Sequence, residues 1–127
     1  MFQVVVREHF DAAHFLRNYQ GKCSQLHGHR WDVEICVAGP RLDQVGMLVD
    51  FGEIKSAVKE ILDKLDHQLI NEVDGFKPEQ LNPTAENLAF FLFLTIKDLL
   101  KLEAESAQLA WIKVYESPDS WAVYKED

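Results

Sequence analysis

The fold is decided by residues 23–37, which read CSQLHGHRWDVEICV. Within this stretch, residues 30–37 alternate between polar and apolar side chains, which predicts a strand with one buried face. Residues 2–14 are rich in Val and Phe and predict a second strand. The polar segment 17–22 lies between them and contains Gly21, as is typical of a connection between antiparallel neighbours. The two strands are therefore expected to pair.

Downstream of this pair, the apolar residues recur at helical spacing. A first helix is predicted from residue 50 to about residues 66–67, and Asp50 with Glu53 resembles a capping box. A second helix is predicted from Thr84, as its N-cap, to about Leu102. Its centre, residues 88–94, is apolar on every face, which is more than one side of a small sheet can bury. We therefore expect this helix to reach a subunit interface.

Two last strands are predicted at residues 109–116 and 121–124, joined by a turn. The element order is then ββααββ, an α+β fold with two helices on one face of an antiparallel sheet. The length suits one hydrophobic core, so a single domain is expected over residues 1–127. Four strands leave exposed sheet edges, and a homo-oligomer would cover them.

Composition and charge exclude several classes of function. Thirteen Lys and Arg against 21 Asp and Glu give a formal net charge of −8 without a basic stripe, so no nucleic acid partner is expected. No apolar run approaches the roughly 20 residues of a bilayer-spanning helix, and nothing resembles a secretion signal. We therefore expect no membrane association and a cytoplasmic location. Cys23 and Cys36 do not suggest a disulfide framework.

Three histidines predict a metal site. His27 and His29 are two residues apart on an extended segment, so their side chains lie on the same side. His14 ends the preceding strand, which an antiparallel pairing brings beside the start of the next. Three neutral nitrogen ligands with an open fourth position suit a catalytic zinc ion. The alternative is that these are ordinary surface or core histidines, which is our interpretation of His9.

Other reactive groups have more than one interpretation from the residues alone. Cys23, four residues before His27, could be a fourth ligand, a base, a nucleophile or an inert residue. Asp66 and His67, at the end of the first predicted helix, are a candidate acid and base or a structural pair. Glu116 continues the apolar face of its strand, so its carboxylate either has a partner or marks where the strand reaches solvent.

Several motifs in order resemble the 6-pyruvoyltetrahydropterin synthase family, and most closely its bacterial, carboxy-forming branch in queuosine biosynthesis. They cover nearly the whole chain and include FDAAH at 10–14, CSQLHGH at 23–29, GMLVDF at 46–51, LDHQLIN at 65–71, PTAENL at 83–88 and VYE at 114–116. A lone H-x-H would be a weak signal, whereas this many spaced motifs are specific.

The resemblance implies a role for each candidate residue. Zinc would be held by His14, His27 and His29. Cys23 would accept a proton, with Asp66 and His67 as its relay. The carboxylate of Glu116 would bind the pterin's amino and ring N–H groups, and Thr84 and Ala85 would line the pterin pocket through backbone groups, from a neighbouring subunit. The implied architecture is the tunnelling fold, in which subunits join edge to edge into a barrel as a trimer or hexamer.

The implied reaction converts 7,8-dihydroneopterin triphosphate into 6-carboxy-5,6,7,8-tetrahydropterin, acetaldehyde and triphosphate, without an external redox cofactor. Three residues separate Cys23 from His27, as in the carboxy-forming branch that the chain resembles, whereas the pyruvoyl-forming branch has a longer insert there. The resemblance therefore implies carbon–carbon cleavage and not formation of 6-pyruvoyltetrahydropterin. Two alternative functions are an inactive zinc- or pterin-binding module and a cysteine hydrolase. For the triphosphate, the nearest basic candidates are Arg17, Lys22 and Arg30.

Overall fold

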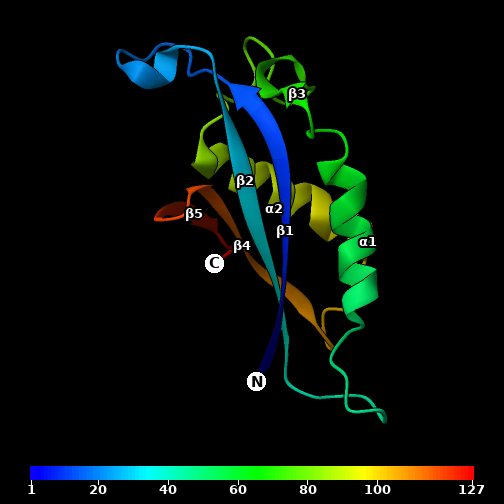
Figure 1. Cartoon of the computed structure of the whole chain (residues 1–127). Coiled ribbons are helices and arrows are strands. Elements are labelled where there is room, and N and C mark those ends of the chain that lie inside the picture. Colours follow the sequence, from blue (N-terminus) through cyan, green and yellow to red (C-terminus); the bar gives the residue numbers. More distant parts are fainter.

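The computed structural model describes residues 1–127 as one five-stranded sheet with two helices (Figure 1). Its strands follow the order β3-β1-β2-β4-β5, and all neighbouring pairs are antiparallel except β1 with β3. The elements are β1 (Phe2–His14), β2 (His27–Gly39), α1 (Phe51–Leu62), β3 (Gln68–Leu69), α2 (Ala85–Leu100), β4 (Gln108–Ser117) and β5 (Ser120–Tyr124), with short 3₁₀ turns η1 (Lys22–Ser24) and η2 (Ile70–Glu72). The predicted ββααββ order is confirmed, with β3 as an addition.

The β1–β2 pair forms the centre of the sheet. The two strands are paired antiparallel along their full lengths, from Phe2 opposite Gly39 to His14 opposite His27. Strand β2 begins at His27, earlier than the alternation alone predicted, so the H-G-H motif is part of the strand. On its inner face, Trp31, Val33 and Ile35 are fully buried, as alternation predicts for a strand with one covered side.

The predicted N-caps of both helices are confirmed. Asp50 accepts a hydrogen bond from the Gly52 N–H at 2.7 Å, and the Thr84 hydroxyl accepts one from the Asn87 N–H at 3.1 Å. Helix α1 ends at Leu62 rather than near residues 66–67. The apolar spacing continues beyond this end because Leu65, which lies in the following turns, is also fully buried.

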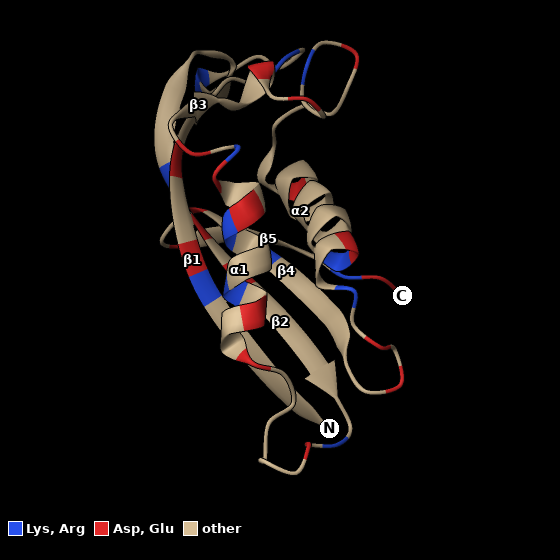
Figure 2. Ribbon diagram, turned by 90° about the vertical axis from the view of Figure 1, so that its right-hand side faces the viewer, with Lys and Arg blue, Asp and Glu red and all other residues tan.

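Both helices cover the same face of the sheet, as Figures 1 and 2 show from two directions. The core lies between these layers. We expected the apolar centre of α2 to need a subunit contact, but most of it packs within the chain. The Phe91 ring meets Phe76 at a centroid distance of 4.9 Å, and Phe90 meets Tyr124 at 5.1 Å. Only Leu94 of this stretch is exposed.

Charged residues of both signs are interleaved over the surface, and Figure 2 shows Lys and Arg scattered among Asp and Glu along α1 and β1. This agrees with the expectation that no basic stripe exists. Neither helix combines the length and apolar character needed to cross a bilayer.

Removing the first helix cap gives a test of this local structure. Asp50→Ala is expected to lower the free energy of unfolding by about 1 kcal/mol, because the N–H groups of the first turn lose their acceptor. Asp63→Ala is the matched control, since Asp63 is exposed and only pairs with Lys59 one turn earlier. Its effect should stay below about 0.5 kcal/mol. Equal losses in the two variants on urea unfolding would contradict the capping role.

Candidate metal centre and adjoining cavity

The three predicted metal ligands meet at one end of the β1–β2 pair. His14 ends β1 and lies directly opposite His27, and His29 lies opposite Ala12. The ring centroids of His14, His27 and His29 are between 4.6 and 5.2 Å apart. The predicted convergence of the three imidazoles is therefore confirmed.

Hydrogen bonds orient two of these rings so that bare nitrogens face each other. His14 Nδ1 lies 2.7 Å from the Pro83 carbonyl oxygen, and His27 Nδ1 lies 2.6 Å from that of Gln25. A carbonyl only accepts, so in each neutral ring Nδ1 carries the proton and Nε2 presents a lone pair. The two Nε2 atoms are 3.0 Å apart. Two facing lone pairs repel each other unless a cation lies between them, so these residues fit a metal ion.

Burial favours the neutral form of two of these histidines. His14 is fully buried, and burial lowers its pKa despite the Pro83 carbonyl. Burial also lowers the pKa of His29 below its ordinary value. The neutral imidazole is thereby favoured, and this is the form that ligates metal. The Trp31 ring packs edge-on against both, at centroid distances of 4.8 and 5.2 Å.

Glu116 joins this cluster from the end of β4. Its Oε1 lies 3.3 Å from His14 Nε2 and 3.5 Å from His29 Nε2. The four donor atoms all lie within 4.8 Å of one another, and His29 Nε2 is buried without a hydrogen-bond partner. The carboxylate that interrupts an apolar strand face therefore has partners in this chain, which the sequence did not reveal.

A cavity of about 410 Å³ adjoins the cluster through Glu116. It is lined by Glu116, by the start of α2 and by β5, with contributions from Ala85, Glu86 and Ser120 through Val123. Its size lies within the range of small-molecule sites. Ala85 and Glu116 line the same cavity within one chain, and the contribution of residues 83–85 to a neighbouring subunit's pocket stays a prediction. The Thr84 hydroxyl caps α2, its N–H donates to the Asn82 carbonyl at 2.8 Å, and its carbonyl accepts from the Leu88 N–H at 2.9 Å.

The remaining predicted groups lie outside this cluster. Cys23 is a free, half-buried thiol in η1 that is not among the four clustered donors. Asp66 Oδ2 lies 2.9 Å from His67 Nδ1, so this pair is formed. The backbone N–H of Asp11 donates a hydrogen bond to the Asp66 carboxylate, and this is the largest cause that lowers the pKa of Asp66. The hydrogen bond with the His67 side chain lowers this pKa further. Within one chain no hydrogen bond joins Cys23 to either residue of the pair.

The backbone at His67 has a left-handed conformation, with φ of 59°. Such a conformation costs a non-glycine residue about 1 kcal/mol or more. The His67 N–H donates to the Asp11 carbonyl at 2.6 Å, which ties the turn after α1 to β1. The exposed imidazole is thus held at a fixed point beside the sheet edge.

Of the basic candidates for a phosphate group, Arg17 is engaged elsewhere. Its guanidinium donates to the Phe76 and Leu81 carbonyls, both at 2.8 Å, so it fixes the loop before α2. Arg30 Nε lies 3.4 Å from Asp11 Oδ1, so this guanidinium is already paired with a carboxylate. Lys22 is exposed and makes no ion pair.

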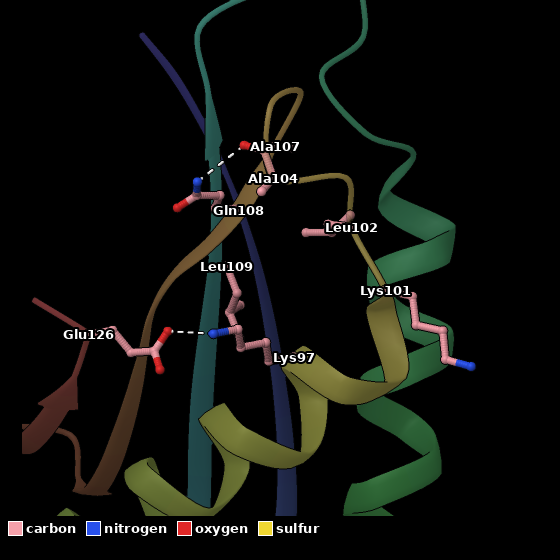
Figure 3. Close-up of a pocket in the computed structure, with 8 residues that line it drawn as sticks. All are labelled: Lys97, Lys101, Leu102, Ala104, Ala107, Gln108, Leu109 and Glu126. Carbon is pink, nitrogen blue, oxygen red and sulfur yellow. Dashed lines mark hydrogen bonds and ion pairs between the residues drawn. The ribbon is translucent and has the colours of Figure 1, made fainter.

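A second cavity, of about 290 Å³, lies at the other end of α2 (Figure 3). Two of its three charged residues pair with each other, because Lys97 Nζ lies 2.6 Å from Glu126 Oε1, and the third is Lys101. It contains no histidine or cysteine. The reactive groups of the chain are therefore gathered at the histidine end.

The fold and the histidine cluster beside a small-molecule cavity define an α+β protein with a candidate metal site. Comparison with known proteins identifies its family. The family model described as 6-pyruvoyl tetrahydropterin synthase matches residues 3–127. The chain belongs to this family.

Similar proteins agree in sequence and in structure. The chain is 35% identical to a Rickettsia bellii protein and 34% identical to a Bacillus subtilis protein, both named 6-carboxy-5,6,7,8-tetrahydropterin synthase. The alignment with the Rickettsia bellii protein covers 94% of this chain and 96% of that protein. The alignment with the Bacillus subtilis protein covers 92% of this chain and 80% of that protein. The solved structure of Caenorhabditis elegans 6-pyruvoyl tetrahydropterin synthase superposes with a TM-score of 0.87 over 99% of this chain and 96% of that one, at 24% identity. It confirms the predicted fold.

Proposed function

We propose that this chain converts 7,8-dihydroneopterin triphosphate into 6-carboxy-5,6,7,8-tetrahydropterin, acetaldehyde and triphosphate, as a zinc-dependent lyase of queuosine biosynthesis. The observation that carries this proposal is the set of converging Nε2 atoms beside the cavity that Glu116 lines. The names of the curated relatives support 6-carboxy-5,6,7,8-tetrahydropterin as the product. Zn²⁺ would be held by His14, His27 and His29 and, when bound, would act as a Lewis acid on substrate oxygen.

Glu116 and the start of α2 would bind the pterin ring. A carboxylate accepts two hydrogen bonds side by side, which matches the amino and ring N–H groups at one edge of a pterin. The backbone of Ala85, which lines the cavity, would meet the ring from the α2 side, and Thr84 would add a contact through its carbonyl.

Cys23 would serve as the base that removes a proton from the substrate's side chain, with Asp66 and His67 passing the proton onward. Because these groups do not meet within one chain, a neighbouring subunit would complete the relay. Figure 1 shows η1, which carries Cys23, and β3, which follows His67, at the same end of the molecule. Both are therefore available at one surface.

We propose a homo-oligomer, a trimer or hexamer, with active sites at its subunit interfaces. Strand β1 pairs with β3 only at residues 12 and 13, so the rest of its outer edge is open. At the opposite edge, Trp121 and Val123 of β5 are about half exposed, at 51% and 50%. Open edges with apolar side chains favour pairing with another copy. The free thiols Cys23 and Cys36 fit a reducing compartment, for which we propose the cytoplasm.

Product analysis tests the reaction. Incubating the purified protein with 7,8-dihydroneopterin triphosphate should release acetaldehyde in step with triphosphate, because the short loop from Cys23 to His27 sets the reach of the base. Mass spectrometry of the pterin and an enzymatic assay for acetaldehyde give the ratio. Triphosphate with 6-pyruvoyltetrahydropterin and no acetaldehyde would assign the chain to the pyruvoyl-forming reaction. A protein that binds zinc without turnover would be an inactive module.

A further inference from the structure

Glu116 occupies a position that hydrogen bonding to histidine does not explain. Its Oε1 approaches His14 Nε2 at 3.3 Å, yet the neutral His14 ring already places its proton on Nδ1, toward the Pro83 carbonyl. That Nε2 has no hydrogen to donate in this tautomer. A carboxylate oxygen and an imidazole lone pair at this distance repel each other, and a shared cation removes the repulsion.

His29 supports the same reading independently. Its Nε2 is buried, has no hydrogen-bond partner and lies 3.5 Å from the same Glu116 oxygen. An unpartnered buried polar atom is costly, and ligation of a cation satisfies it. Three imidazole nitrogens and one carboxylate oxygen form a complete four-donor set for zinc. The carboxylate thus lies where an open coordination position was predicted.

The same carboxylate also borders the cavity of about 410 Å³, together with Ala85 and Glu86. Glu116 is partly exposed, with 34% of its side chain accessible, so it can turn toward either side. One carboxylate cannot bind a cation among the histidines and accept hydrogen bonds from a ligand in the cavity at full strength at the same time, because both interactions use the same negative charge.

We propose that Glu116 is an exchangeable fourth zinc ligand. With the cavity empty it closes the coordination of the ion, and when the amino and N–H edge of a pterin enters the cavity it leaves the ion for the pterin. Ring binding therefore opens the coordination position that the substrate's side chain needs. This inference rests on the proposed function, and it gives Glu116 a role in the ligand-free protein as well as in pterin binding.

The proposal implies that zinc and pterin weaken each other's binding, since the two compete for Glu116. Such a coupling is reciprocal, so either affinity can be measured. Unsubstituted pterin is the suitable probe because it has no side-chain hydroxyl with which to reach the ion itself. The measurement is a competition titration of zinc against a chelator on the full-length protein, with and without saturating pterin.

For the wild-type protein, we expect saturating pterin to lower zinc affinity about fivefold or more. Glu116→Ala and the shape-conserving Glu116→Gln should weaken zinc binding about tenfold or more without pterin, and pterin should then have no further effect on zinc. Glu86→Gln is the control, because Glu86 lines the same cavity without touching the histidines. It should keep zinc affinity within about twofold, as expected for a carboxylate outside the ligand set.

A second readout follows the ligand set directly. In the cobalt-substituted protein, pterin should change the visible absorption of the ion in the wild type and leave it unchanged in Glu116→Gln. If Glu116→Ala and Glu116→Gln bind zinc as tightly as the wild type, the inference is wrong, and the proposed function stands with Glu116 as a pterin contact alone. If His27→Ala also binds zinc normally, the histidine site is wrong and both proposals fall.

Discussion

Cys23→Ala should retain one zinc per chain while turnover falls by at least about a hundredfold, the usual loss when a positioned base is removed. The physical reason is that Cys23 lies outside the cluster of four donor atoms, so its removal leaves the metal-binding groups intact. Metal analysis and steady-state rates on the same preparation separate the two effects.

The other cysteine provides the control for this experiment. Cys36 is buried in β2, where burial raises the pKa of its thiol, so it is not suited to proton transfer. Cys36→Ala should keep turnover close to that of the wild type. Loss of zinc from Cys23→Ala would instead make the thiol a ligand, and full activity in that variant would remove it from the mechanism.

His27→Ala and His29→Ala are each expected to lose zinc on dialysis, because each variant lacks one of the three imidazole donors and keeps only two beside the Glu116 carboxylate. These two positions are preferable to His14, because the His14 ring is fully buried and its loss would leave a hole in the core. Zinc content after dialysis, with circular dichroism to check the fold, gives the measurement.

His9→Ala is the matched control, since His9 is exposed on β1 and belongs to no cluster of potential ligands. It should retain one zinc per chain. Stoichiometric zinc in both His27→Ala and His29→Ala would show that the ion binds elsewhere, whatever the geometry of the imidazoles.

The meeting of the three histidines was predictable from sequence because it depends only on local rules. Alternation gives the phase of a strand, and an antiparallel pair brings the end of one strand beside the start of the next. The structure confirms this with His14 opposite His27. The N-caps at Asp50 and Thr84 were predictable for the same reason, since each cap is a contact within three residues.

The approach of Glu116 to the histidines was not predictable, because it depends on the register between β2 and β4. This pairing shifts between Cys36 and Val37, where the partners move from Trp111 to Leu109. A bulge of this kind changes which residues lie opposite each other, and no residue type in the stretch marks it. Strand alternation could only show that the side chain of Glu116 faces inward.

Strand β3 and the end of α1 also could not be predicted from the sequence. Strand β3 has two residues, too few for any periodicity to indicate it. The predicted end of α1 was too late because apolar spacing reports burial, and Leu65 is buried after the helix has ended. The relay between Cys23 and His67 stays a prediction, since it requires a second subunit.

The position of the ligands along the chain has a consequence for biogenesis. All three imidazoles lie between residues 14 and 29 on paired β1 and β2, whereas Glu116 lies near the C-terminal end. During synthesis, the histidine hairpin therefore leaves the ribosome well before the segment that carries Glu116. A cation captured at that stage would close the loop between the strands and lower the entropy of the nascent chain. The carboxylate would be added last, when β4 pairs with β2.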